Sequence, residues 1–336
     1  MFQSIQFKNF KVLREATLQL RPFTLILGPN GSGKSTALQA LLALQNLNRF
    51  QFSDVASVGA GVVKDVSVTI RWAAPFSECV TVMNWAQDNR KALNYLHEKN
   101  RTRLGDEIVI ELQRILNGIQ VCAFDSEAVI QPVMLTPNAT LSPKGMNLPV
   151  VLDRLRDQWP ERFEAINKEM RQWLPEFDTI LFDTPDNGQR SIKLRMKQSG
   201  VAIAAKDLSQ GTLQALAILT IAYLPDPPRA IGIEEPDRGI HPRLLRQVRD
   251  ALYRLSYPDQ FGEGRAPTQV IATTHSPYFL DLYRDRPEEV VLAEKLDTGA
   301  RFIPLSSYQH LEEILRDTQL GEAWYSGILG GVPTNS

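Results

Sequence analysis

A glycine-rich segment near the N-terminus, Gly-Pro-Asn-Gly-Ser-Gly-Lys-Ser-Thr at positions 28–36, limits what this chain can fold into more than any other segment. It matches the phosphate-loop pattern G-x-x-x-x-G-K-[ST] at every fixed position. The apolar run at 24–27 that precedes it is typical of a strand buried on both faces. The spacing of leucines at 38, 41, 42 and 47 predicts a helix after it. A chance glycine-rich turn would not have these two flanks, so we expect the beginning of an α/β fold.

The chemistry of this segment favours a nucleoside triphosphate. Glycines allow successive backbone N–H groups to point at a phosphate, and the following helix N-terminus adds partial positive charge. We expect Lys34 to face the β- and γ-phosphates, with a catalytic contribution, and the Ser35 hydroxyl to bind Mg²⁺. The predicted ligands are therefore ATP and Mg²⁺. The nucleotide-binding residues expected from this loop are Asn30, Gly31, Ser32, Gly33, Lys34, Ser35 and Thr36.

Two adjacent acids, Glu234 and Glu235, follow an apolar run at 230–233 that predicts a strand. Such a pair is commonly just solvated, but downstream of a phosphate loop it suits a metal and a water molecule. Mg²⁺ prefers oxygen ligands and keeps several waters, so we expect Glu234 to act on the metal, through a water. We expect Glu235 to be catalytic and to orient or deprotonate the attacking water.

The segment Asp-Leu-Ser-Gln-Gly-Thr at 207–212 precedes an apolar helix pattern. One reading is an ordinary helix N-cap by Ser209. The other is that this helix end, with Ser209, Gln210 and Gly211, binds the γ-phosphate of a nucleotide held by a second subunit.

A lone histidine, His275, directly follows a predicted strand at 269–272. A single histidine is more often structural than functional. This one lies at the carboxyl end of a strand, however, where ligands bind in open α/β sheets. We therefore expect it to hydrogen-bond the γ-phosphate and to take part in catalysis.

The rest of the pattern is coarser. Alternating residues predict strands near 2–7, 16–20, 66–72, 179–182 and 191–196. Between 84 and 176 the pattern is less regular, with a polar helix expected at 91–99, proline-rich loops at 131–149 and an apolar helical stripe at 155–170. Further helices are expected from 212, from 242 and at 311–315, with a surface loop at 258–267. Arginines at 243, 246 and 249 share one helical side, either as a solvated face or as a phosphate contact.

Composition excludes several classes of protein. The formal net charge is −1, from 37 basic and 38 acidic residues, so there is no global attraction to nucleic acid. No apolar run reaches the roughly 20 residues of a membrane span, and the N-terminus has no signal-peptide core. Two cysteines are too few for a disulfide framework. We expect a cytoplasmic protein with no membrane contact.

Together these motifs resemble the ABC-type P-loop ATPases, and among them the RecF/SMC-related, OLD-like group called AAA_21-type. The resemblance is carried by Ile-Gln-Phe-Lys-Asn-Phe at 5–10, the phosphate loop, Leu-Ser-Gln-Gly-Thr at 208–212, Glu-Glu-Pro-Asp-Arg-Gly-Ile-His-Pro at 234–242 and Thr-Thr-His-Ser-Pro at 273–277. It implies an α/β ATPase head with a mixed sheet, an antiparallel β subdomain and a helical insertion. The expected divisions are an N-terminal core at 1–83, the insertion at 84–176, a C-terminal core at 177–290 and a tail at 291–336.

The resemblance also implies roles for single residues. The phosphate loop would be Walker A, Glu234 and Glu235 Walker B with the catalytic glutamate, 208–212 the signature acting in trans, Asp237 the D-loop aspartate and His275 the switch histidine. Asn9, Phe10 and Lys11 lie where such ATPases approach the base, and Gln131 is the candidate Q-loop glutamine on the metal. Two residues depart from the common pattern, Glu234 in place of aspartate and Gln210 in place of glycine.

The choice among the classes of protein in this family depends on the segments between and after the motifs. The segment between Lys34 and Ser209 has no heptad run for an SMC coiled coil, and the stretch after His275 is short for the TOPRIM nuclease domain of OLD proteins. We therefore expect an ATP-dependent homodimer that hydrolyses ATP and controls an effector in trans, a nuclease, in DNA maintenance or anti-phage defence, with DNA as a further partner. The alternatives are the ATPase subunit of a transporter and a nucleotide-stabilised assembly module with negligible turnover.

Overall fold

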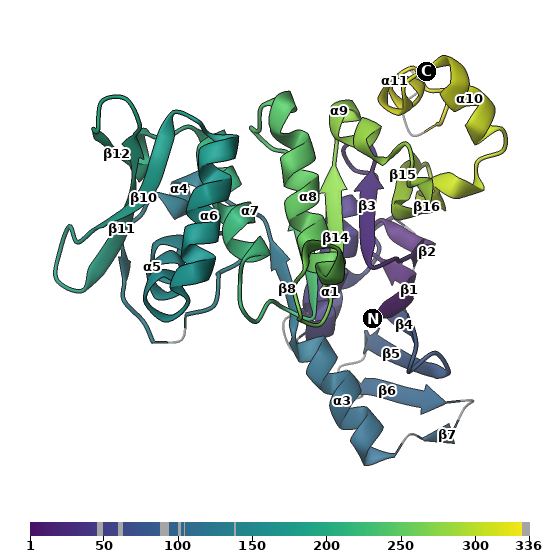
Figure 1. The fold of residues 1–336 in the computed structure, drawn as a ribbon. Helices are drawn as coiled ribbons and strands as arrows, with labels where there is room; N and C mark the ends of the chain where they lie inside the picture. Colours follow the sequence, from purple (N-terminus) through teal and green to yellow (C-terminus); the bar gives the residue numbers. More distant parts are fainter. Residues whose placement is uncertain are drawn as a thin grey trace. The chain divides into compact units, whose positions relative to one another are not determined.

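The computed structural model describes residues 1–45, 50–59, 63–87, 94–99, 102–103, 105–137 and 139–330 (Figure 1). The chain divides into two compact units. The first consists of Met1–Val121, Pro228–Glu234 and Pro267–Ser336, and the second of Cys122–Pro227 and Glu235–Ala266.

The first unit is organised around a six-stranded sheet of order β16-β15-β3-β14-β13-β8. Strand β3 (Phe23–Leu27) pairs in parallel with β14 (Gln269–Thr274) and with β15 (Val290–Leu296), and β14 pairs in parallel with β13 (Ala230–Glu234). Every residue of β3 and β14 is buried, as expected for parallel strands covered on both faces. The three strands predicted at 24–27, 230–233 and 269–272 are thus confirmed. Strands β16 (Gly299–Pro304) and β8 (Ile119–Cys122) form the edges.

An antiparallel sheet of order β2-β1-β4-β5-β6-β7 forms the second layer of this unit. Its alternate side chains in β4, from Val66 to Trp72, are fully buried, and they share one apolar core with Leu38 and Leu41 of α1 (Lys34–Gln45). The strands are β1 (Phe2–Phe10), β2 (Leu13–Gln19), β4 (Asp65–Trp72), β5 (Cys79–Ala86), β6 (Asn94–Lys99) and β7 (Thr102–Arg103). Helices α2 (Phe52–Val55) and α3 (Asp106–Asn117) complete this part.

The second unit is built around one helix, α7 (Gln210–Ala222), in which every residue from Thr212 onward is buried. Helices α5 (Leu148–Gln158), α6 (Pro160–Trp173) and α8 (Leu245–Ser256) pack against it. A small antiparallel sheet joins β10 (Phe177–Asp183), β11 (Gln189–Met196) and β12 (Ala202–Ala204), with β9 (Val133–Met134) also on β11. Helix α4 (Ser126–Val129) precedes β9.

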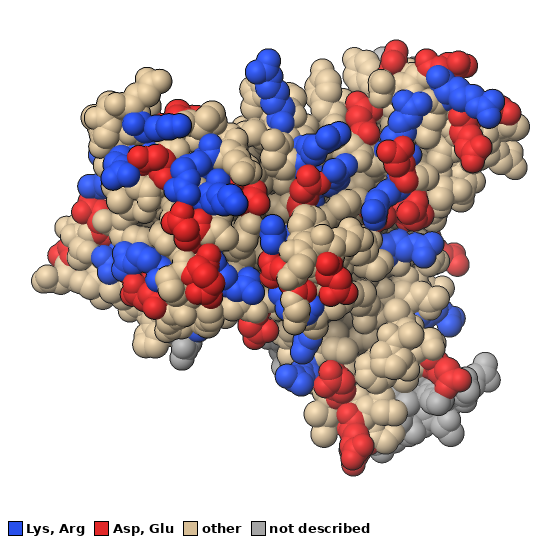
Figure 2. All heavy atoms as spheres, viewed as in Figure 1, with Lys and Arg blue, Asp and Glu red and all other residues tan. Residues whose placement is uncertain are grey.

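Three short helices lie toward the C-terminus of the first unit, namely α9 (Pro277–Leu280), α10 (Leu311–Asp317) and α11 (Leu320–Tyr325). The helix predicted at 311–315 is therefore confirmed. Within the described residues, none of the helices is long and apolar enough to cross a membrane. Acidic and basic side chains are interspersed over the face shown in Figure 2, consistent with the balanced composition.

Two sequence predictions about helices are wrong. The polar helix expected at 91–99 is strand β6 over Asn94–Lys99. This segment pairs with β5, and sheet pairing outweighs a weak helical pattern. Residues 91–93 lie outside the described residues. The single helical stripe expected at 155–170 is two helices. Trp159 ends α5 and Pro160 begins α6, since proline has no N–H to continue the hydrogen-bond ladder.

The observed division of the chain also differs from the expected one. Residues 84–121 of the expected insertion belong to the first unit, and the rest belongs to the second. Strands β15 and β16 lie beyond residue 289, so the first part of the expected tail belongs to the central sheet. Leu47, counted in the helical pattern after the phosphate loop, lies outside the described residues.

Candidate nucleotide-binding and hydrolysis site

The register of the central sheet brings three predicted motifs to one edge. Leu27 at the end of β3 is paired with Thr274 at the end of β14, and Thr273 is paired with Glu234 at the end of β13. Parallel strands in register finish at the same edge of the sheet. The phosphate loop, His275 and Glu234 therefore all lie at that edge. This is the edge at which open α/β sheets bind ligands.

The glycines of the phosphate loop are required by its close packing. A Cβ on Gly28 would lie 2.3 Å from the carbonyl oxygen of Ala293 in β15. Gly33 has φ +93°, and a Cβ there would lie 2.8 Å from a methyl group of Leu13. Gly31 also has positive φ, at +76°. These positions exclude side chains, so the backbone itself forms the surface of the loop.

The polar groups inside the loop fit an anionic ligand. Lys34 is 5% exposed, and its Nζ donates to the carbonyl oxygens of Gly28 at 2.7 Å and Pro29 at 2.8 Å. The hydroxyl of Ser32 is fully buried and has no hydrogen-bond partner among the described residues. A buried ammonium and an unpaired buried hydroxyl suit a phosphate group, which accepts from both. Asn30 and Gly31 are at the exposed rim, and Thr36 is half-buried on α1.

The metal-binding pair predicted from the sequence is in direct contact. The exposed hydroxyl of Ser35 donates a hydrogen bond to Oε1 of Glu234. Both are oxygen donors, and Mg²⁺ in nucleotide sites takes one or two protein oxygens and completes its shell with phosphate and water. The described residues contain no cluster of three His, Cys, Asp or Glu side chains that could hold a metal. A site of this composition therefore fits the nucleotide-linked ion and not a metal held by protein alone.

The second acid of the pair starts a different structural unit, since the boundary between the units falls between Glu234 and Glu235. Glu235 is half-buried and has φ +45°, a backbone conformation uncommon outside glycine. Its carbonyl oxygen accepts from the N–H of Arg238 at 3.0 Å, and that of Asp237 accepts from Ile240 at 3.1 Å. The two acids are therefore sequence neighbours held by separate sets of contacts.

The signature segment bears out one of the two readings made from the sequence, the helix N-cap, and its contact with a nucleotide held by a second subunit stays a prediction. Ser209 caps α7, because its Oγ accepts from the N–H of Thr212 at 3.1 Å. Ser209 and Gln210 are nevertheless exposed at the start of a helix of 13 residues. Gly211 is needed for packing, since a Cβ there would lie 2.2 Å from the carbonyl oxygen of Gly239. The cap is structural, and it leaves the outer surface of the helix end open to an anion.

His275 is half-exposed in the turn between β14 and α9. The next residue, Ser276, fixes this turn, because its N–H donates to Oγ1 of Thr274 at 3.0 Å and its Oγ accepts from the N–H of Phe279 at 3.2 Å. The turn is thus tied to the strand before it and to the helix after it.

Three other residues that were predicted to contact the nucleotide or the metal have different surroundings in the structure. Phe10 is 1% exposed and its ring packs 5.9 Å from that of Trp85, so its side chain belongs to the core and only its backbone could approach a base. Asn9 donates from its side chain to the carbonyl oxygen of Asp65 at 3.0 Å. Gln131 is exposed in the second unit and donates to the carbonyl oxygen of Glu127 at 3.2 Å. A base contact for Asn9 and a metal contact for Gln131 stay predictions.

One charged residue near the phosphate loop was missed. Lys295 of β15 is exposed, and its Cδ lies 3.9 Å from the position that a Cβ on Gly31 would occupy. The apolar run that opens β15, Val290–Ala293, could have predicted a buried strand and so a second cation at this edge.

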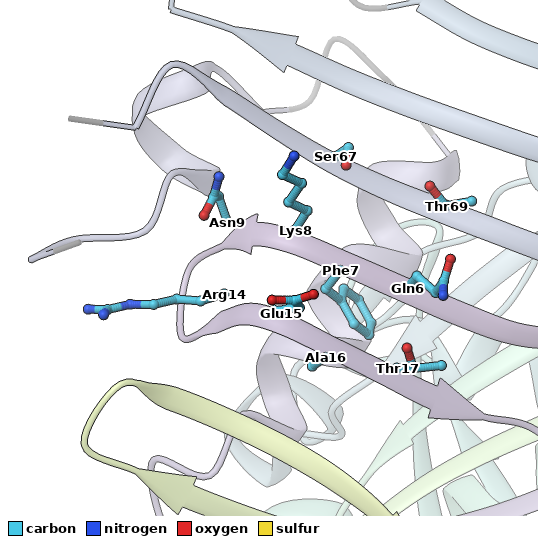
Figure 3. Close-up of a pocket in the computed structure, with 10 residues that line it drawn as sticks. All are labelled: Gln6, Phe7, Lys8, Asn9, Arg14, Glu15, Ala16, Thr17, Ser67 and Thr69. Carbon is cyan, nitrogen blue, oxygen red and sulfur yellow. The ribbon is translucent and has the colours of Figure 1, made fainter. Parts of the chain in front are cut away.

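A polar groove of about 620 Å³ lies on the antiparallel sheet (Figure 3). It is lined by residues of β1, β2 and β4, and no phosphate-loop residue lines it. Of the residues predicted for the nucleotide site, Asn9 lines this groove. The lining residues are Gln6, Phe7, Lys8, Asn9, Arg14, Glu15, Ala16, Thr17, Ser67 and Thr69.

Comparison with known proteins agrees with this geometry. The family "AAA ATPase domain" matches residues 1–111, and the family "AAA domain, putative AbiEii toxin, Type IV TA system" matches residues 142–281. The OLD nuclease of Thermus scotoductus is 24% identical over 87% of the chain. These matches support an OLD-like, ABC-type P-loop ATPase. The chain spans 64% of the length of the Thermus nuclease.

Solved structures show the same fold. An SMC head bound to the C-terminal winged-helix domain of ScpA aligns with a TM-score of 0.61 at 15% identity, over 90% of this chain and 96% of that one. The SMC head domain of Thermotoga maritima aligns with a TM-score of 0.51 at 15% identity, over 90% and 98%. The chain therefore has the head fold expected from its sequence, a mixed sheet with an antiparallel layer and helices.

Proposed function

We propose that this OLD-like ATPase is a switch that binds ATP·Mg²⁺, dimerises around it, hydrolyses it, and in doing so controls a separate effector in the cytoplasm. The observation that carries the proposal is the hydrogen bond between Ser35 and Glu234 at the edge where the phosphate loop begins. This contact between a hydroxyl of the phosphate loop and the acid that ends β13 supports a shared Mg²⁺ ion, which takes one or two protein oxygens in nucleotide sites.

Each residue of the site has a defined task in hydrolysis. Lys34 and the backbone of the loop hold the phosphates, and Ser35 and Glu234 supply oxygens for the metal, which neutralises charge on the phosphates. Glu235 orients a water whose oxygen forms a bond to the γ-phosphorus while the bond to the β–γ bridging oxygen breaks. The proton of the water passes toward Glu235, and the products are ADP and phosphate. His275 donates to the γ-phosphate.

The exposed start of α7 supports a dimer. Ser209 and Gln210 present the N-terminal end of a 13-residue helix to solvent, with its partial positive charge. In the proposed dimer this end contacts the γ-phosphate of the nucleotide bound by the partner. Loss of that phosphate on hydrolysis removes the contact and releases the dimer, which makes the assembly a switch.

The chemical class of the effector is proposed from the names of the similar proteins. The Thermus relative is named a nuclease, and the family matching residues 142–281 is described with a toxin. We propose that the ATP-bound dimer acts on a nuclease in trans, in anti-phage defence or DNA maintenance, with DNA as a further partner. The balanced charge of the chain agrees with control of an acting partner more than with tight DNA binding by the ATPase itself.

The decisive experiment measures molar mass by light scattering for wild type and Glu235→Gln, with and without ATP·Mg²⁺. The variant keeps the size of the side chain but removes its basicity, so it should accumulate an ATP-bound dimer while phosphate release is lost. Glu176→Gln, an exposed acid of the same unit, serves as the control and should behave as wild type. Wild type that binds ATP with negligible turnover would show a nucleotide-stabilised module instead. A mass unchanged by ATP would contradict the dimer switch.

A further inference from the structure

The start of α7 is fastened to the turn that carries Glu235 by a buried side chain, Gln214. It is 6% exposed, and its Nε2 donates to the carbonyl oxygen of Glu235 at 3.3 Å. The same carbonyl oxygen accepts from the N–H of Arg238 at 3.0 Å. A carbonyl oxygen only accepts, so the amide must present its nitrogen here. The backbone of Glu235 is therefore held from both sides.

A second contact joins the same two segments independently. Gly211, one turn before Gln214, lies so close to Gly239 that a Cβ on it would be 2.2 Å from the Gly239 carbonyl oxygen. Gly239 itself has φ +70°, and a Cβ there would lie 3.4 Å from the backbone nitrogen of Gly211. Both contacts lie within the second unit. The signature end of α7 and the turn at 235–240 thus form one packed body.

The backbone at Glu235 needs such support. Its φ of +45° is uncommon for a residue with a side chain, and backbone in this region persists where the surroundings hold it. The residue before it, Glu234, ends β13 in the first unit, paired with Thr273. Consequently the metal acid is fixed to the sheet of the phosphate loop, whereas the water-orienting acid is fixed to the signature helix.

We propose that Gln214 is a positioning residue that makes hydrolysis at one ATP of the dimer depend on occupancy of the other. This inference rests on the proposed function. The signature end of each protomer contacts its partner's nucleotide, and Gln214 passes that restraint to Glu235 of the same protomer, which acts on the protomer's own nucleotide. With both sites filled, both Glu235 carboxylates are held in position to orient the attacking water. Turnover therefore rises cooperatively with ATP concentration.

The test replaces Gln214 and compares it with a matched change on the same helix. Gln214→Met keeps the length of the side chain and removes the donor, and Gln214→Glu keeps the shape while replacing the donor by an acceptor. The control is Thr220→Val. Thr220 is fully buried on α7 and donates to the carbonyl oxygen of Leu216 at 2.7 Å, so the control also deletes a buried hydrogen bond but touches no part of the site.

Phosphate release is measured against ATP concentration, and ATP-dependent dimerisation by light scattering, for all four proteins. Both Gln214 variants should lose about 10- to 100-fold in kcat, the size expected for a misplaced catalytic group. Their ATP concentration for half-dimerisation should stay within about twofold of wild type, and the Hill coefficient of turnover should fall from above 1 to about 1. Thr220→Val should keep the kcat and Hill coefficient of wild type.

The inference is overturned if Gln214→Met retains cooperative turnover, or if Thr220→Val loses kcat to the same extent. It is also overturned if kcat and dimerisation fall together in the Gln214 variants, because the side chain would then support the helix and not Glu235. Failure of the proposed function is distinguishable, because it appears in wild type as absent turnover or absent ATP-dependent dimerisation.

Discussion

The hydroxyl of Ser35 donates a hydrogen bond to Oε1 of Glu234, across 199 positions of sequence. Two parallel pairings produce this contact, β3 with β14 and β14 with β13, in a register that ends the three strands at one edge. The contact therefore depends on the whole central sheet and not on local structure. It is the structural basis for the proposal that Ser35 and Glu234 share a metal ion.

Removing the Ser35 hydroxyl should weaken binding of ATP in the presence of Mg²⁺. Ser35→Ala deletes one oxygen from the proposed metal shell and leaves the backbone of the loop intact, so we expect a loss of about 10- to 100-fold in affinity for ATP·Mg²⁺. Isothermal titration with ATP in EDTA provides the internal control. Metal-free binding should match wild type, and an equal loss with and without Mg²⁺ would contradict a metal role for Ser35.

The parts of the fold that sequence could predict are those with strong periodicity. The runs in β3, β13 and β14 are continuous and apolar, and β4 alternates cleanly, so their burial follows from pattern alone. Strand β6 was misassigned because its place is set by pairing with β5, a long-range effect that local residues do not encode. The break at Pro160 was overlooked inside a good helical stripe, although proline is the expected signal for it.

The residues of the candidate site likewise divide into those that the sequence could predict and those that it could not. Motif spacing was enough to propose Lys34, Ser35 and Glu234 as one group, and the sheet places them at one edge. The contact of Gln214 was not predictable, because a glutamine inside an apolar helix pattern gives no sign of which carbonyl oxygen it meets. Phe10 shows the opposite error, since an aromatic residue in a motif was expected near a base and instead completes the core.

Gly211 should tolerate no side chain. In Gly211→Ala the new Cβ meets the backbone of Gly239, which cannot rotate away as a side chain would, and we expect a loss of about 1–3 kcal/mol in the free energy of unfolding. Gly264→Ala is the control, because nothing lies within 4 Å of a Cβ there. Urea unfolding of both variants measures the difference. A control that loses as much as Gly211→Ala would argue against the close contact.

Glu263 forms the centre of a half-buried charge cluster in the second unit. Its side chain is 11% exposed and it accepts from Arg254 and Arg265, each at 2.9 Å, and from Arg162 at 3.3 Å. Burial alone would raise the pKa of Glu263, but the hydrogen bond from Arg254 and the charges of Arg265 and Arg162 outweigh it and lower that pKa below 4.5. Arg265 also donates to the carbonyl oxygen of Ala222, so the cluster holds the C-terminal end of α7.

Neutralising Glu263 should therefore destabilise the protein in a pH-dependent way. Glu263→Gln leaves three half-buried arginines without their common partner. Because solvent partly screens these charges, we expect a loss of about 1–3 kcal/mol in the free energy of unfolding at pH 7. A lowered pKa contributes stability that is fully present above pH 4.5 and is lost as the pH falls through the lowered value. The difference between variant and wild type, measured by urea unfolding, should thus shrink in acid. A difference independent of pH would show that packing and not charge is responsible.

A bulky cation at the signature should separate nucleotide binding from dimerisation. In Ser209→Arg the helix cap is lost and a long side chain projects from the exposed end of α7, so contact with a partner's γ-phosphate is blocked. The phosphate loop of the same protomer is unchanged, and fluorescence titration should give an affinity for ATP·Mg²⁺ within about twofold of wild type, because cap loss costs only about 1 kcal/mol of stability.

Ser199→Arg, an exposed serine of the same unit whose Oγ accepts from the N–H of Val201, is the matched control. It should still dimerise with ATP and turn over, whereas Ser209→Arg should remain monomeric by light scattering and release no phosphate. Loss of ATP binding by the Ser209 variant alone would place the signature at its own protomer's nucleotide, and the in-trans arrangement would then be wrong.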